Sequence, residues 1–211
     1  MLVLSRSLPI LLGMIGLIFI AFPLSFLPDY MNGKPDNAQI NYLLMAHGLL
    51  LLGSLLPYLA LLPSWLEENS CELLHAKTNI KTPCLRELLW SLHFYILMII
   101  IPLIVVSVML QLPLAEMLRV ILELLFVMSA YYLLIGLLRS ALIGTMVMTL
   151  YIMFCILECR NADLQLFCIF RPDLLCYEGF FYNEGIALLP MTFLCGIAGY
   201  RIEKASSGIN R

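Results

Sequence analysis

Long stretches without a charged residue constrain the fold of this chain more than any other feature. Four of them carry no charge at all: 7–28, 37–66, 88–115 and 140–157. A helix needs about 20 apolar residues to cross the hydrocarbon of a bilayer, and in lipid only helices and closed barrels satisfy their own backbone. The stretches do not alternate polar and apolar residues as barrel strands do, so they predict transmembrane helices.

The composition agrees with a protein embedded in lipid. Apolar residues make up 62% of the chain and charged residues 12%, whereas an average soluble domain carries about 25% charged residues. The mean hydropathy is +0.97. These values exclude a soluble enzyme domain, a disordered chain and a nucleic-acid binder with a basic face.

We therefore expect an all-α, polytopic membrane protein with one transmembrane domain over residues 1–211. Six spans are predicted, the last of them short: 7–28, 38–63, 86–111, 117–138, 140–157 and 181–200. Short links around 112–116 and 136–140 predict antiparallel neighbours. The segment 29–39 holds Asp, Asn, Gly and Pro, which is typical of an exposed turn.

The placement of Lys and Arg predicts the orientation, because cytoplasmic loops carry an excess of these residues. With both termini in the cytoplasm, eight cations lie inside: Arg6, Lys77, Lys81, Arg86, Arg139, Arg201, Lys204 and Arg211. Four lie outside: Lys34, Arg119, Arg160 and Arg171. This split predicts a multi-pass protein of the cell membrane whose two termini are cytoplasmic.

The connection between spans two and three begins with acids and ends with cations. Over 65–81, a helix would place four apolar residues on one broad side: Leu66, Leu73, Leu74 and Ala76. This pattern predicts a short amphipathic helix on the inner membrane surface, although such helices occur in membrane proteins of every class. Thr82 then offers an N-cap and Pro83 suits a first helical position, so span three is expected to begin there as a new helix.

The same segment resembles the cytoplasmic segment of ABC-2 type transporter permeases. The resemblance rests on the pattern Glu68-x-x-x-Glu72-Leu73-Leu74-x-Ala76, then Thr82-Pro83-x-x-x-Glu87-Leu88. The sequence departs from the family where Ser70 and Cys71 replace a glycine. The end of the chain, Tyr200-Arg201-Ile202-Glu203-Lys204, is similar to the aromatic and basic exit after the sixth span of the family.

The resemblance implies the permease subunit of an ATP-driven transporter, which exports more usually than imports, here a peptide, a lipid or another hydrophobic compound. The segment 65–81 would be a coupling helix that contacts a separate cytoplasmic ATPase through Glu67, Glu68, Glu72, Leu73, Leu74, His75 and Lys77. This sequence has no G-x-x-x-x-G-K-[ST] loop to hold a nucleotide phosphate. We therefore expect no catalytic residue and no cofactor in this chain, with ATP and Mg²⁺ bound by the partner. Two ATPases and two permeases, either identical or homologous, would form the assembly in the lipid bilayer.

The connection between spans five and six mixes short apolar patches with aromatic residues. Over 159–180 we expect re-entrant or interfacial helices, which ABC-2 permeases often have before their last span; an outer loop anchored by aromatic residues is the alternative. Its three cysteines, Cys159, Cys168 and Cys176, allow one disulfide if this segment faces outward. The seven cysteines of the chain show no zinc spacing, so no metal site is expected.

Ionisable residues within spans are costly and usually face the interior of a bundle or a cavity. The candidates are His47, His93, Arg119 and Glu123. For Arg119 and Glu123 we expect an i, i+4 ion pair near the outer interface, with a place on a substrate path as the alternative. For each histidine, a neutral, hydrogen-bonded ring is expected rather than a proton relay. Five hydroxyl side chains either bond across helices or back-bond to their own helix: Ser54, Ser107, Ser129, Thr145 and Thr149.

Two other classes of protein remain open. A non-transporting membrane scaffold, sensor or immunity-type protein would have the same composition and the same interfacial helix. An intramembrane enzyme is the second class, but no Ser-His-Asp, H-E-x-x-H or paired-carboxylate arrangement stands out in the sequence. A retained ATPase partner would distinguish a transporter from a scaffold.

Overall fold

The regular elements of this chain are helices. The computed structural model describes residues 12–61, 83–158, 168 and 186–209, and these residues contain no β-strand. The elements, with π-helical turns named η, are η1 (Leu17–Ala21), α2 (Phe22–Met31), α3 (Pro35–Leu44), η2 (Met45–Leu49), α4 (Leu50–Leu61), α7 (Pro83–Met109), α8 (Leu114–Leu138), α9 (Ala141–Glu158) and α10 (Ile186–Ile209). The prediction of an all-α fold is confirmed for this part of the chain.

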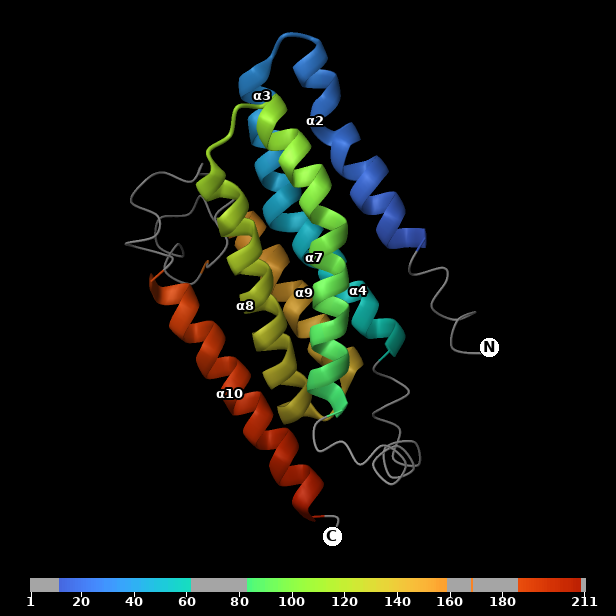
Figure 1. Ribbon diagram of the computed structural model, residues 1–211, viewed down its shortest axis with the longest axis vertical. Helices are drawn as coiled ribbons and strands as arrows, with labels where there is room; N and C mark the ends of the chain where they lie inside the picture. The colour runs from blue at the N-terminus through green and yellow to red at the C-terminus, as the bar shows by residue number, and fades with distance from the viewer. Residues whose placement is uncertain (1–11, 62–82, 159–167, 169–185, 210–211) are drawn as a thin grey trace.

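Five helical segments are long and apolar enough to cross a membrane, namely Leu12–Met31, Pro35–Leu56, Cys84–Met109, Leu114–Leu138 and Ala141–Glu158. Successive segments run in alternating directions, and α10 continues the alternation alongside α8 (Figure 1). The α2–α3 turn lies at one end of the bundle. The end of α4, the start of α7 and the end of α10 lie toward the other (Figure 1). The α10 helix is not among the five, so the sixth span stays a prediction.

The described links between helices are short, and one is shorter than the sequence indicated. The exposed turn predicted over 29–39 shrinks to three residues, because α2 continues to Met31 and α3 begins at Pro35. Proline suits the first turn of a helix, where its missing N–H costs nothing. Gly33 has a φ of +70°, which glycine adopts freely. The tight links predicted on either side of α8 are confirmed, each with one residue of positive φ, Gln111 and Arg139.

The start of α7 agrees with its sequence signal. The helix begins at Pro83, the residue expected to occupy its first position. It runs without interruption through Pro102 to Met109, so the proline does not end the helix. The described helix of the third pass therefore begins two residues after the segment 65–81.

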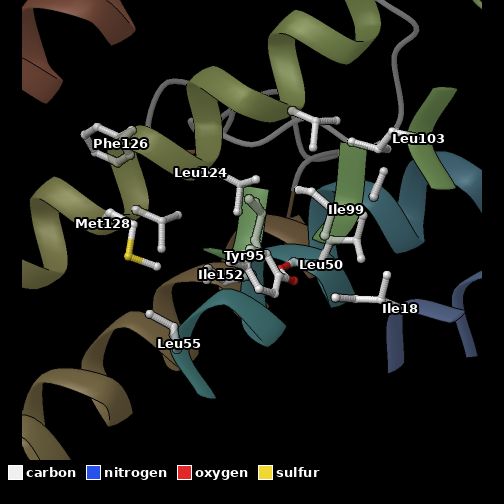
Figure 2. Packing of buried hydrophobic residues seen from close by; sticks show 14 of the residues in the cluster. Ile18, Leu50, Leu55, Tyr95, Ile99, Leu103, Leu124, Phe126, Met128 and Ile152 are labelled. Atoms are coloured by element: carbon white, nitrogen blue, oxygen red, sulfur yellow. Dashed lines mark hydrogen bonds between the residues drawn. The ribbon is translucent and has the colours of Figure 1, made fainter. Parts of the chain in front are cut away.

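The core lies where α4, α7, α8 and α9 meet. Side chains from all of these helices converge there, among them Leu50, Tyr95, Leu124 and Ile152 (Figure 2). Tyr95 is fully buried, and its hydroxyl donates a hydrogen bond to the Leu50 carbonyl at 2.6 Å. A buried phenol needs such a partner, because an unmade hydrogen bond in an apolar interior is costly.

Helix α10 packs against α8 more extensively than any other described pair of helices pack. A Cβ atom built on Gly199 would lie 2.6 Å from the ring of Tyr132, closer than real contacts allow. A Cβ atom built on Gly136 of α8 would lie 3.2 Å from the Ile202 side chain of α10. Small residues let two helix backbones approach closely, which is how helices associate in lipid where the hydrophobic effect gives no net attraction.

Candidate functional site: a buried ionic network

Three charged side chains share one face of α8. Glu116, Arg119 and Glu123 are spaced by three and then four residues, which places them one above another on a helix. Their exposed fractions are 0%, 1% and 0%. In a helix that is otherwise apolar, this face points into the protein and away from lipid.

The facing residue, His47, lies in an irregular part of the second pass. It belongs to η2, whose π-helical register is shown by the hydrogen bond from the Leu50 N–H to the Met45 carbonyl, an i to i+5 bond. Such single turns occur within α-helices, frequently at functional sites. The turn is held from two sides. Tyr95 binds the Leu50 carbonyl, and a Cβ on Gly48 would lie only 2.8 Å from the Ile156 side chain of α9.

The imidazole of His47 bridges the two carboxylates. Its Nδ1 lies 2.5 Å from Glu123 Oε2, and its Nε2 lies 2.6 Å from Glu116 Oε1. Arg119 Nε donates to the other oxygen of Glu123 at 3.1 Å, and its Nη1 lies 3.9 Å from Glu116 Oε2. All four side chains are at least 99% buried, so the network is a buried contact between the second and fourth passes.

The charges of this network balance only with a shared proton. Two carboxylates and one guanidinium leave a net charge of −1 when the imidazole is neutral. One further proton, on the ring or on either carboxyl, brings the network to zero. An uncompensated charge in an apolar interior costs several kcal/mol or more.

Two buried hydroxyl groups, one of them close to the network, have no hydrogen-bond partner among the described residues. Tyr42 of α3 is fully buried and within electrostatic reach of Glu116, Glu123 and Arg119. Its hydroxyl and that of Ser107 lie near each other, yet neither completes a hydrogen bond within the described part of the chain. Buried hydroxyls without a hydrogen-bond partner are uncommon in proteins, and each calls for an explanation, such as a role in binding a polar group.

The structure extends the predicted setting of Arg119 and Glu123. Their i, i+4 ion pair is present, and it is a buried part of a larger network. Arg119, which was counted among the cations on the outer side, lies within α8, which begins at Leu114.

Sequence reasoning missed Glu116, which it assigned to the link between spans three and four. The available signal was the spacing 116, 119 and 123, which is that of a single helix face. His93, by contrast, does not join the network. It is exposed on α7 and its ring meets Trp90 edge-on, with ring centroids 6.4 Å apart.

The hydroxyl side chains within the passes behave in both of the expected ways. Ser54 back-bonds to the Leu51 carbonyl at 2.6 Å. Thr145 does the same to Ala141 at 2.8 Å, and also bonds across helices to the Tyr131 hydroxyl at 3.0 Å. No group of His, Cys, Asp and Glu among the described residues is placed to hold a metal ion.

A second polar contact ties three helices together at the end of the bundle where α7 begins. Glu203 of α10 accepts a hydrogen bond from the Cys84 N–H at 2.9 Å and another from the Tyr132 hydroxyl of α8. The first N–H groups of a helix have no partner within it and favour a negative charge. Glu203 therefore caps α7 while it binds α8.

The remaining predicted site residues lie outside the described part of the chain. They are the coupling residues Glu67, Glu68, Glu72, Leu73, Leu74, His75 and Lys77, and the cysteines Cys159 and Cys176. Cys168 is described and is buried, with 5% of its surface exposed. The coupling helix and the disulfide stay predictions.

Comparison of this chain with protein-family models, with curated proteins and with solved structures finds no match.

Proposed function

We propose that this chain is the permease subunit of an ABC transporter of the ABC-2 type, driven by a separate cytoplasmic ATPase. The support is the sequence of the segment 65–81, the alternating apolar helices and the contact of Glu203 with the first turn of α7. The carried substrate would be a peptide, a lipid or another hydrophobic compound, and the likeness to ABC-2 permeases favours export.

The contact at Glu203 is the observation that carries this proposal. Helix α7 begins at Pro83, two residues after the segment 65–81, so a force on that segment acts on its first turn. Glu203 holds the Cys84 N–H and the Tyr132 hydroxyl together. A displacement of α7 is thereby passed to α8 and α10 at once.

The proposed mechanism follows from this arrangement. ATP binding would close the two ATPases and push the coupling segments of two permeases. The α7 helix would shift, and α8 would move with it through Tyr132, whose ring also packs against Gly199. A pathway at the interface between the two permeases would then alternate its access between the two sides of the membrane.

Removing one hydrogen bond at this contact tests the proposal. Tyr132→Phe keeps the ring that packs against Gly199 but removes the donor to Glu203. A hydrogen bond to a charged group contributes about 1.5–3 kcal/mol, so we expect roughly a tenfold loss of coupling. Coupling is measured as the ATP-dependent change in labelling rate of a cysteine introduced by Leu114→Cys, at the far start of α8, in the complex with its ATPase.

The matched control is Tyr131→Phe, because Tyr131 bonds Thr145 of α9 instead of α10. We expect it to leave the ATP-dependent change intact. In Tyr132→Phe, ATP hydrolysis should continue while the labelling change is lost. An undiminished labelling change in Tyr132→Phe would contradict the role assigned to this contact.

A further inference from the structure

We propose that His47, Glu116 and Glu123 form an intramembrane proton-binding site. In this arrangement the three side chains hold one proton beyond a neutral imidazole and two carboxylates. That proton joins the second pass to the fourth. The inference does not depend on the transporter proposal, since it follows from hydrogen bonding and charge alone.

The hydrogen-bond geometry gives the first argument. Both ring nitrogens of His47 lie at hydrogen-bond distance from carboxylate oxygens, 2.5 Å and 2.6 Å. A neutral imidazole has one donor and one acceptor, and an ionised carboxylate can only accept. Two such contacts therefore need one more proton, either on the ring or on a carboxyl.

Charge balance gives the second argument. Arg119 is always positive, and it contacts both glutamates. With the extra proton, the four side chains sum to zero charge. Without it they carry −1 in a region where each of them is at least 99% buried, and the ring nitrogen that lost its hydrogen faces a carboxylate.

The surroundings of His47 give the third argument. Charged groups come to it from α8 alone among the described elements that pack on η2: Glu116, Arg119 and Glu123. Tyr42 of α3 adds a phenol within reach of the same carboxylates, and the other neighbours from α2, α4 and α9 that line this core are mainly apolar.

The site has a conformational consequence. The proton is shared between η2 and α8, so the two passes cannot part without leaving a carboxylate or the ring unpaired. Movement of α8 against the second pass must therefore release this proton or admit water to the site.

Counting the proton in the unmodified, full-length chain in lipid nanodiscs tests the proposal. Nitrogen NMR of ¹⁵N-histidine reports whether the His47 ring carries one or two hydrogens, and infrared spectroscopy reports a protonated carboxyl. His75→Gln and His93→Gln assign the signals without disturbing the site. We expect, at neutral pH, either a doubly protonated His47 or one protonated carboxyl.

Glu116→Gln provides the second arm. An amide can donate to the ring nitrogen, and the charges then balance with a neutral imidazole, so the extra proton should be lost. Glu203→Gln is the matched control and should keep it. The proposal is overturned by a singly protonated His47 ring without a protonated carboxyl in the unmodified chain, or by an extra proton that persists in Glu116→Gln.

Discussion

Replacing His47 by leucine is expected to lower the free energy of unfolding by about 3–5 kcal/mol, because removing one member of a buried ionic contact leaves its partners uncompensated. Leucine fills similar space but donates to neither carboxylate. Glu116 and Glu123 would then lose the ring that bridges them. Denaturant-induced unfolding of the purified chain in detergent measures the loss.

The same substitution at an exposed position is the control. His93→Leu changes a side chain on the outer face of α7, so its effect should stay within about 0.5 kcal/mol. A double variant, His47→Leu with Glu116→Gln, removes one negative charge and restores a net charge of zero. It should recover a substantial part of the lost stability. Equal losses for the two histidines would show that the network does not hold the passes together.

Replacing Arg119 by methionine is expected to lower the free energy of unfolding by a similar amount, about 3–5 kcal/mol, because it removes the positive charge of the network. The methionine chain fills the volume, but the two carboxylates lose their permanent positive charge. With the shared proton in place the network then carries −1. Unfolding in detergent should therefore occur at clearly lower denaturant concentration than in the unmodified chain.

Two further variants isolate the cause. Arg201→Met removes an arginine from an exposed position on α10 and should change stability by no more than about 0.5 kcal/mol. Arg119→Lys keeps the charge but not the planar donor that binds Glu123 through Nε, so its loss should be smaller than that of methionine. If lysine and methionine gave the same loss, the charge would not be what matters.

The apolar stretches predicted most of the fold because lipid imposes a simple rule on the backbone. Each of the first five predicted spans corresponds to a helical segment long enough to cross a membrane. Pro83 marked the start of α7 correctly, since proline is favourable at a first helical position. The extent of α10 was harder to predict. Its predicted span is short, and its described helix extends through Arg201 and Lys204 to Ile209.

The network could be predicted only in part. A local rule gave the ion pair of Arg119 and Glu123, which are four residues apart. The contact between His47 and Glu116 joins residues 69 apart in sequence and depends on how two passes approach each other. The π-helical turn that positions His47 has no recognisable signal in the sequence. It is stabilised by tertiary contacts, through Tyr95 and Gly48.

Glu203 illustrates the same division between local and tertiary information. The sequence placed it in the aromatic and basic segment that follows the predicted sixth span. The structure assigns it two partners on other helices, Cys84 and Tyr132. Neither contact follows from spacing along the chain, so its capping of α7 had to come from the fold.

Isolation of the chain together with the proposed ATPase partner tests the proposed function most directly. The tagged, full-length chain would be cross-linked in its native membranes, purified, and assayed for a bound subunit with a nucleotide-binding P-loop and for ATP hydrolysis. We predict a stoichiometric ATPase that is lost with Leu74→Asp in the coupling segment and retained with Leu114→Asp, at the opposite end of the bundle. A folded chain that carries no ATPase would contradict the proposal and favour a scaffold or sensor.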